Sequence, residues 1–479
     1  MSVAVSPVPV AVDRPAFLGL GVSIGLAAIA GVLLTAGYAL HPLWWAPWLA
    51  PIALIAAGRG DARQARIAGG IAGSVALFSV LPYYIEINGW VGTVVIALLR
   101  ISAWVFAARL SLDAARRLPL GLAMLVLPAT IAALEMLALA ISPHGAAGSL
   151  AYSQMDMPAT IQVAALGGVP AVVFLILLPG SLVGLLVARA WPRQQIFVGA
   201  VSLAVIGAVV AVFSVVRLDA STTTPTIPVT LIATDRFPLI ATEWDPVWEV
   251  YRSAVERSAK PHGLVVLPEK IALLDGAGAK RAAVMVAATA HVTQATIVVG
   301  IEVEDAGVYR NRALVAAPDG HTAWYDKQRL VPGLEARDVP GTAPLFADLA
   351  GARFGVAICK DMHIPSIGRE YAEAAALMAV PAWDFGQDGW MGARMSALRA
   401  VENGYSLARS ARDGFVGAYD RTGRVLVERP TGDRVTIADA TLPASGRETV
   451  YARIGDIFGW ASVGSVVLLM AWLRRPIMR

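Results

Sequence analysis

Long apolar runs constrain this chain more than any other feature of its sequence. Seven of them fill most of the first 218 residues, and each is close to the roughly 17–25 residues with which a helix crosses a bilayer. They cover residues 16–36, 43–58, 67–85, 89–109, 119–141, 160–188 and 195–217. An eighth run, residues 455–473, lies near the carboxyl terminus. The pattern predicts a polytopic α-helical membrane domain with about eight spans.

The composition agrees with a membrane protein. Hydrophobic residues make up 57% of the chain and charged residues 15%, whereas a soluble domain carries about 25% charged residues. This balance excludes an ordinary soluble enzyme, a disordered chain and a disulfide-rich secreted module. The net charge of +4 is small, and the arginines lie in short clusters between the apolar runs. We therefore expect no nucleic-acid partner.

Basic residues fall in alternate loops between the apolar runs, and this alternation predicts the orientation of the chain. Three loops carry arginine, and the loops between them carry neither lysine nor arginine. The arginines are Arg59, Arg63, Arg66, Arg116, Arg117, Arg189 and Arg193. The positive-inside rule places the amino terminus inside and residue 219 onward outside. Arg474, Arg475 and Arg479 follow the last run and place the carboxyl terminus inside as well.

Residues 219–450 differ in character and predict an α/β domain inserted before the last span. Short β-type runs alternate there with amphipathic segments such as 246–258 and 279–291. The runs cover residues 227–232, 263–267, 296–301, 313–317, 354–358 and 377–380. We expect a membrane domain over 1–218, the α/β domain over 219–450 and a last span over 455–473.

Three β-type runs end near a reactive side chain. These side chains are Glu269, Lys327 and Cys359, the only cysteine of the chain. Because the carboxyl ends of strands gather in one place in an α/β sheet, we expect the three to meet. There a thiolate would attack a carbonyl, a carboxylate would carry the proton, and an ammonium would stabilise negative charge. The alternative is two surface charges and a buried structural cysteine.

The same segments resemble the nitrilase (carbon–nitrogen hydrolase) superfamily. The matching motifs are Leu-Pro-Glu at 267–269, Asp-Lys-Gln-Arg-Leu-Val-Pro at 326–332 and Ile-Cys at 358–359. The resemblance implies an αββα sandwich and a catalytic triad of Glu269, Lys327 and Cys359. It also implies that Glu335, in Gly-Leu-Glu eight residues after the lysine, holds that lysine in place.

Spans on both sides of such a domain resemble one branch of that superfamily, the apolipoprotein N-acyltransferases. The resemblance implies that Cys359 takes an acyl chain from a membrane phospholipid and passes it to the α-amine of a diacylglyceryl-cysteine lipoprotein. It further implies a monomer in the bacterial cytoplasmic (inner) membrane, with the catalytic domain on the outer, periplasmic side. No cofactor is expected, because no phosphate-cradling glycine motif appears. No metal is expected, because the histidines lack ligand spacing.

Residues near these motifs are candidates for lining the substrate route. Trp244 lies in a segment that resembles the family's Trp-Asp arm. Trp383, Phe385 and Trp390 lie in a segment that resembles a loop beside its active site. His363 is a further candidate because it follows the nucleophile closely. We expect Trp244, Phe385 and Trp390 to keep water away from a thioester.

Residues 360 and 361 depart from the family pattern. The acyltransferases have an aromatic residue and a glutamate after the nucleophile, and this chain has Lys360 and Asp361. Asp361 keeps a supporting acid on a shorter arm. Lys360 adds a cation beside the thiol, where it either lowers the pKa of the thiol or points into solvent.

Two charged residues, Arg100 and Glu135, lie inside apolar runs, where charges are costly and are candidates for a function. We expect them to form a buried pair that ties two helices together. Contact with a lipid headgroup or a substrate is the alternative.

Two other functions fit the sequence less well. A membrane-anchored amidase of the nitrilase kind would transfer acyl groups to water from a small, wet pocket. A non-catalytic lipid-binding scaffold would keep the fold without a need for Glu269, Lys327 and Cys359. A dry site with a lipid-sized groove favours the acyltransferase.

Overall fold

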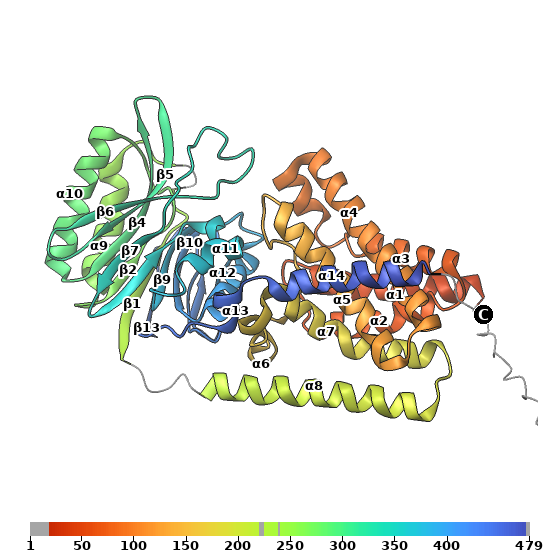
Figure 1. Cartoon of the computed structure of the whole chain (residues 1–479). Coiled ribbons are helices and arrows are strands. Elements are labelled where there is room, and N and C mark those ends of the chain that lie inside the picture. The colour runs from red at the N-terminus through yellow and green to blue at the C-terminus, as the bar shows by residue number, and fades with distance from the viewer. Residues whose placement is uncertain (1–18, 220–224, 238–239, 476–479) are drawn as a thin grey trace, which may run out of the picture.

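Helices fill one end of the molecule and two β-sheets fill the other (Figure 1). The computed structural model describes residues 19–219, 225–237 and 240–475. The helical end contains α1 Leu20–Tyr38, α2 Ala46–Ala57, α3 Ala62–Val75, α4 Leu81–Arg117, α5 Leu120–Ile141, η1 Leu150–Gln154, α6 Pro158–Ile161, α7 Ala164–Ala188, α8 Arg193–Asp219 and α14 Ile457–Leu473.

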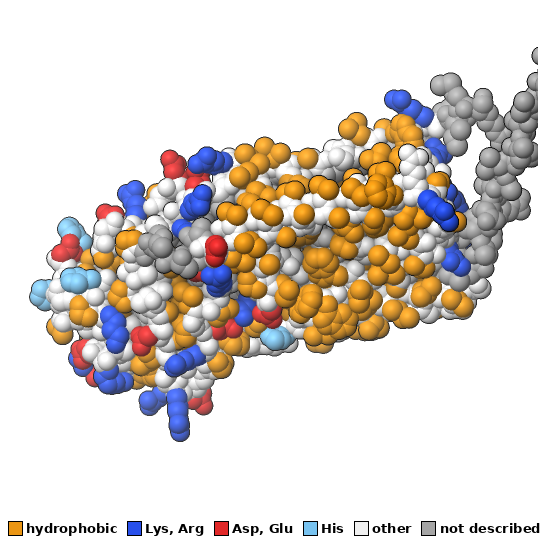
Figure 2. Space-filling view, turned by 90° about the horizontal axis from the view of Figure 1, so that it is seen from below, with side chains coloured by type: hydrophobic (Ala, Val, Ile, Leu, Met, Phe, Trp, Pro, Cys, Tyr) orange, Lys and Arg blue, Asp and Glu red, His pale blue; other side chains and the backbone are white. Residues whose placement is uncertain are grey.

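Five of these helices are long and apolar enough to cross a membrane, namely α1, α4, α5, α7 and α8. Two shorter apolar helices, α2 and α14, have 12 and 17 residues. On the face shown in Figure 2, hydrophobic side chains cover most of the helical end, whereas charged side chains gather on the sandwich and, as Lys and Arg, at the far tip of the helices. The chain therefore has the apolar surface of an integral membrane protein, and the expected total of eight spans stays a prediction.

The expected span over residues 67–85 is divided in the structure. Helix α3 ends at Val75, and α4 begins at Leu81 after a stretch of turns. Pro82 lies in the first turn of α4, where its missing N–H costs nothing, and it cannot continue a helix from upstream. α4 then bends at Gly89, whose backbone is not helical, and runs on to Arg117. An apolar run alone does not reveal such a break.

Helix α7 breaks at Gly167 and Gly168 where it meets the other end of the molecule. Gly168 has a φ of +67°, and a Cβ there would lie 2.5 Å from the ring of Tyr451. Only glycine combines this conformation with so close an approach. The break at these two residues permits close packing against α13 (Val450–Ile454).

Helix α8 stands apart from the other helices for most of its length (Figure 1). Only 6% of its most apolar stretch is buried in the protein. At its carboxyl end, Arg217 donates to the side chain of Gln162 and to the carbonyl of Val401. This helix is therefore anchored at its carboxyl end and exposes an apolar surface along most of its length.

The two sheets have the strand orders β13-β1-β2-β4-β5-β6, with β3 on β4, and β12-β11-β10-β9-β8-β7. Their strands are β1 Thr226–Ala233, β2 Leu264–Val266, β3 Leu273–Asp275, β4 Thr296–Asp305, β5 Val308–Ala316, β6 Thr322–Asp326, β7 Leu345–Leu349, β8 Ala352–Val356, β9 Leu377–Trp383, β10 Ser406–Arg412, β11 Phe415–Tyr419, β12 Val425–Pro430 and β13 Thr436–Pro443. Within them β1-β2-β4 and β8-β9-β10 are parallel, so their carboxyl ends meet at one edge of each sheet. The predicted α/β architecture is confirmed.

Four layers result, in the order helices, sheet, sheet, helices. Helices α9 Trp244–Ser258 and α10 Gly276–Thr293 cover the first sheet, and α12 Gly389–Asn403 covers the second. A separate apolar core, with Val266, Phe354 and Ala379 among its members, fills the space between the sheets. The short η2 Cys359–His363 and α11 Pro365–Glu370 follow β8.

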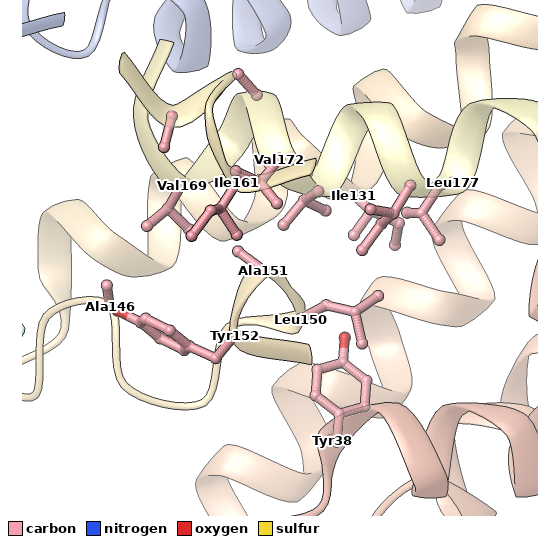
Figure 3. Close-up of a cluster of buried hydrophobic side chains, with 14 of the residues drawn as sticks. Tyr38, Ile131, Ala146, Leu150, Ala151, Tyr152, Ile161, Val169, Val172 and Leu177 are labelled. Atoms are coloured by element: carbon pink, nitrogen blue, oxygen red, sulfur yellow. The ribbon is translucent and has the colours of Figure 1, made fainter. Parts of the chain in front are cut away.

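Helix α12 also joins the sandwich to the helical end. One continuous core contains Leu398 and Val401 of α12 together with residues of α7 and η1. Figure 3 shows part of this core, in which Ile161, Val169 and Val172 lie against Ala151. The sheets therefore rest on the membrane helices through a buried apolar contact and not through a loose linker.

Candidate active site

The structure brings Glu269, Lys327 and Cys359 together at the edge where the two sheets meet. Glu269 follows β2, Lys327 follows β6, and Cys359 follows β8 as the first residue of η2. The Glu269 N–H donates to the carbonyl of Ala382 in the other sheet over 3.2 Å. Gly300 permits this crossing, because a Cβ there would lie 2.4 Å from the Glu269 Cα.

Lys327 and Glu269 form a buried ion pair. The Lys327 Nζ lies 2.7 Å from Glu269 Oε1, and the side chains are 1% and 4% exposed. Asn311 donates to the same oxygen over 2.5 Å. The second oxygen, Oε2, is buried and has no hydrogen-bond partner among the described residues. A buried acceptor without a donor is costly, so this oxygen is suited to receive a proton from a group that enters the site.

Glu335 contacts the lysine as a second buried carboxylate. Its Oε2 lies 2.9 Å from the Lys327 Nζ and accepts the Val331 N–H over 2.7 Å. Burial alone would raise the pKa of Glu335, but the ammonium groups of Lys327 and Lys270 outweigh it and lower the pKa to about 2. Burial likewise opposes the charge on Lys327, whose pKa is nevertheless raised by Glu269 and Glu335. The lysine is therefore a fixed cation.

Cys359 occupies a strained turn directly after β8. Its φ is +44°, in the left-handed region that residues with a Cβ rarely adopt, and such strain is often found at functional sites. The thiol is nearly buried and lies 3.6 Å from the carbonyl of Trp383, to which it donates. Burial and the Glu269 carboxylate raise the thiol pKa, and Lys327 lowers it. The resting nucleophile is therefore a protonated thiol that needs a base.

Asp361 ties the nucleophile to the segment that carries the lysine. Its side chain is fully buried and accepts the N–H groups of Ile358, Gln328 and Arg329 and the hydroxyl of Tyr325. Burial raises the pKa of Asp361 to about 6. The shorter arm of aspartate is sufficient here because all four donors converge on it.

A second buried lysine lies behind the first and was not expected. Lys270, with a φ of +48°, places its Nζ 2.9 Å from Asp338 Oδ2, 3.2 Å from Glu335 Oε1 and 3.3 Å from Glu302 Oε1. Sequence reasoning missed Asn311, Glu302 and Asp338, because they lie within strands or loops that carry no recognisable motif. The one sign of this network in the sequence is that a lysine, Lys270, directly follows Glu269.

The candidate lining residues separate into two groups. Trp383 supplies the carbonyl beside the thiol, and its indole donates to Asp413 over 2.6 Å. Phe385 is partly exposed, and Trp390 is buried with its ring 4.6 Å from that of His41 in the helical end. Trp244 is different: it stacks on Trp248 in the core between the first sheet and helices α9 and α10. That core is separate from the one that contains Cys359, so the expectation that Trp244 covers the thioester is corrected.

Lys360 and His363 follow the nucleophile within η2. Lys360 does not point into solvent, because it is 2% exposed and its Nζ donates to the Leu330 carbonyl over 2.9 Å. The His363 carbonyl accepts the Ala146 N–H of the helical end over 2.9 Å. His363 therefore lies where the sandwich meets the loop between α5 and η1, and the charge of Lys360 acts on His144 of the same loop.

Arg100 and Glu135 form no direct ion pair, contrary to the expectation. Arg100 donates to the Tyr84 hydroxyl and to the Gly148 carbonyl, and its guanidinium lies 4.1 Å from the ring centre of Tyr38. Glu135 accepts the Ser149 hydroxyl and the Leu150 N–H. The Arg100 and Glu135 side chains therefore hold residues 148–150 in place by hydrogen bonds. These residues offer the acceptor and the donors that the two buried charges need.

Among residues 19–219, 225–237 and 240–475, no three His, Cys, Asp or Glu side chains are arranged to hold a metal ion. The site thus consists of a thiol, an acid–lysine pair and their supports. Such a set can form and break a covalent acyl bond at Cys359.

Two family models match the chain. Residues 30–182 match the apolipoprotein N-acyltransferase N-terminal domain, and residues 243–454 match the carbon-nitrogen hydrolase model. Together they cover both the helical end and the sandwich.

Curated relatives carry the same description. An apolipoprotein N-acyltransferase of Geobacter metallireducens is 27% identical over 94% of this chain and 96% of its own length. One from Rhodopseudomonas palustris is 31% identical over 106 residues, 20% of each chain.

Among solved structures, the sandwich is similar to the NitN amidase of Neterenkonia sp. AN1, at 20% identity over 48% of this chain and 96% of that one, with a TM-score of 0.40. It is also similar to a carbon-nitrogen hydrolase superfamily protein of Xanthomonas campestris, at 21% identity over 45% and 90%, with a TM-score of 0.39.

Proposed function

We propose that this chain moves a fatty acyl chain from a membrane phospholipid to a lipoprotein. The chain belongs to the apolipoprotein N-acyltransferase family of the nitrilase superfamily. The acceptor is the N-terminal amine of a diacylglyceryl-cysteine. One observation carries the proposal: the buried Cys359 thiol and the buried Glu269–Lys327 ion pair gather at one edge of a sandwich that rests on apolar helices. The relatives of the same name support it.

In the first half-reaction, the Cys359 sulfur attacks an ester carbonyl of the phospholipid. Glu269 takes the thiol proton on its free Oε2, and the Lys327 ammonium stabilises the negative charge that develops on the carbonyl oxygen. When the ester C–O bond breaks, Glu269 returns the proton to the departing alcohol. A thioester on Cys359 and a lysophospholipid result.

In the second half-reaction, the neutral α-amine of the lipoprotein attacks the thioester carbonyl. Glu269 takes a proton from the nitrogen and delivers it to the departing sulfur, while Lys327 again stabilises the oxyanion. An amide forms, the C–S bond breaks, and the free thiol is restored. Glu335 and Asp361 act as positioning residues. Glu335 holds Lys327, and Asp361 holds the turn that carries Cys359.

The helical end supplies the lipid and keeps water away. The loop after β9 connects directly to α4: Tyr83 donates to Asp388 over 2.7 Å, and Gln387 donates to Glu86 over 2.6 Å. Trp383, Phe385 and Trp390 lie on this connection and line the acyl route in our proposal. We place the sandwich on the outer face of the cytoplasmic membrane with both termini inside, as the arginine distribution predicts.

The transfer can be tested with the purified full-length protein, a phospholipid whose acyl chains are isotopically labelled, and a synthetic diacylglyceryl-cysteine peptide. We expect label on the peptide α-amine, and none on a peptide whose amine is acetylated beforehand. Label released as free fatty acid at the same rate with and without peptide would instead indicate a hydrolase. The Cys359→Ala variant serves as the control for both products.

A further inference from the structure

Lys360 is a buried cation without an acidic partner. Its side chain is 2% exposed, and its one described hydrogen bond is the 2.9 Å contact to the Leu330 carbonyl. An ammonium has three donors, so two of them remain for another group. No carboxylate within the described parts of the chain forms an ion pair with this lysine.

The carboxylates nearest to Lys360 are already engaged. Asp361 accepts four donors from the chain, and Glu335 is bound by Lys327, Lys270 and the Val331 N–H. Burial and the Lys327 charge lower the pKa of Lys360 to about 8, because they outweigh the opposite effects of Glu335, Cys359 and Asp361. A buried charge that is not compensated is costly, so an anion that enters from outside would be stabilised here.

Two imidazoles flank this lysine. His363 lies in η2, and His144 lies in the loop that follows α5, whose Ala146 N–H binds the His363 carbonyl. Burial first, and then the charge of Lys360, lowers the pKa of His144 to about 4 and lowers that of His363 too. Each ring is therefore neutral at pH 7 and offers one N–H. Neither ring makes a hydrogen bond in the parts of the chain that the structure describes.

The Lys360 ammonium and the Cys359 sulfur interact electrostatically, but Lys360 is not among the charges that act most on the pKa of the thiol. The charges that act most on Cys359 are those of Glu269, Lys327, Asp384 and Arg409. Lys360 donates instead to the Leu330 carbonyl, and its charge acts on His144 of the helical end. A role in binding is therefore a better explanation of this lysine than activation of the nucleophile.

We propose that Lys360, with His363 and His144, binds the phosphate diester of the phospholipid that donates the acyl chain. The inference rests on the function proposed above. The phosphate of a glycerophospholipid lies within one glycerol unit of both ester carbonyls, so a carbonyl at Cys359 brings the phosphate close to the next residue. The acceptor, in contrast, presents an amine, which carries no negative charge for a lysine to bind. Lysine binds phosphate well as a point charge.

The test compares two acyl donors, with and without phosphate. Full-length protein in detergent micelles is incubated with dipalmitoyl phosphatidylglycerol or with S-palmitoyl-N-acetylcysteamine, and the gain of one palmitoyl group is followed by intact mass. In Lys360→Met we expect the ratio of the phospholipid rate to the thioester rate to fall by about tenfold, which corresponds to a loss of about 1.4 kcal/mol of binding free energy. Lys360→Arg should restore most of the ratio. Lys280→Met, at an exposed lysine of α10, is the matched control.

Each outcome decides a separate question. An unchanged ratio in Lys360→Met overturns the phosphate site alone. A wild-type protein that accepts palmitate from the thioester but never from the phospholipid overturns the proposed function as well. Inorganic phosphate is added as a competitor: if it slows acylation only when Lys360 is present, and the donor ratio is unchanged, the site binds free anions and the lipid assignment is wrong. The thioester rate itself shows whether the variant is folded.

Discussion

At the scale of single residues, the Cys359 thiol lies between two opposing charges. The Glu269 carboxylate raises the pKa of the thiol, and the Lys327 ammonium lowers it. Removal of the carboxylate should therefore move the thiol pKa down, and removal of the ammonium should move it up. Both variants should lose acylation, because one lacks the base and the other lacks the oxyanion partner.

We predict that Glu269→Gln shifts the pH profile of Cys359 alkylation by iodoacetamide to lower pH, and that Lys327→Met shifts it to higher pH. Acyl transfer should fall by roughly 10²–10⁴-fold in both. The alkylation rate as a function of pH is the measurement. Glu373→Gln, at an exposed acid with no described contact, is the control. Shifts of the same sign in the two variants would contradict the arrangement.

Lys270 compensates three carboxylates at once, so its loss should be severe. We predict that Lys270→Ser destabilises the protein by about 3–5 kcal/mol, because Glu302, Asp338 and Glu335 would lose a buried counter-charge. Thermal unfolding in micelles should show a clearly lower midpoint, whereas Lys280→Ser at an exposed position should not. An unchanged midpoint would mean that the carboxylates are neutral in the wild type.

At the scale of elements, two charged side chains of the helical end hold the loop between α5 and η1 in place. Arg100 binds the Gly148 carbonyl, Glu135 binds Ser149 and Leu150, and Ala146 binds the nucleophile turn. These two intramembrane charges therefore position a loop that lies against the site.

We predict that Arg100→Met and Glu135→Gln each increase amide hydrogen exchange across residues 144–150 and slow acyl transfer from phospholipid by about tenfold. Arg109→Met, in the same helix but paired with Asp113, should change neither quantity. Unchanged amide hydrogen exchange across this loop would show that Arg100 and Glu135 do not hold it in place.

The elements show which features a sequence can predict. The apolar runs and the α/β alternation were visible because each depends on local periodicity, and the motifs at Glu269, Lys327 and Cys359 occur at strand ends. The break between α3 and α4, the layer that contains Trp244 and the Lys270 network were not visible. They depend on contacts between segments far apart in the chain, such as Lys270 with Asp338.

At the scale of the molecule, the sandwich and the helical end share a buried contact. Glu402 of α12 accepts the Val169 N–H directly after the break in α7, and the same break packs on Tyr451. The sandwich is therefore held at a fixed distance from the helices, and the proposed function requires this because its acyl donor would come from the bilayer.

We predict that Gly168→Ala disturbs this contact, because it combines a φ of +67° with a clash against Tyr451. The cost should be about 1–3 kcal/mol, seen as a lower unfolding midpoint and a slower transfer. Gly207→Ala, in the exposed helix α8 with nothing within 4 Å, should have no such effect. Equal behaviour of the two variants would argue against a close fit between the two parts.

The central claim is that Cys359 carries an acyl chain taken from a phospholipid. Its most direct test is the intact mass of the full-length protein after incubation with a defined phospholipid and no acceptor. The account predicts a gain of one acyl chain that hydroxylamine removes and that Cys359→Ala never shows. An unmodified mass with every phospholipid, while Cys359 still reacts with a small thiol reagent, would contradict the claim.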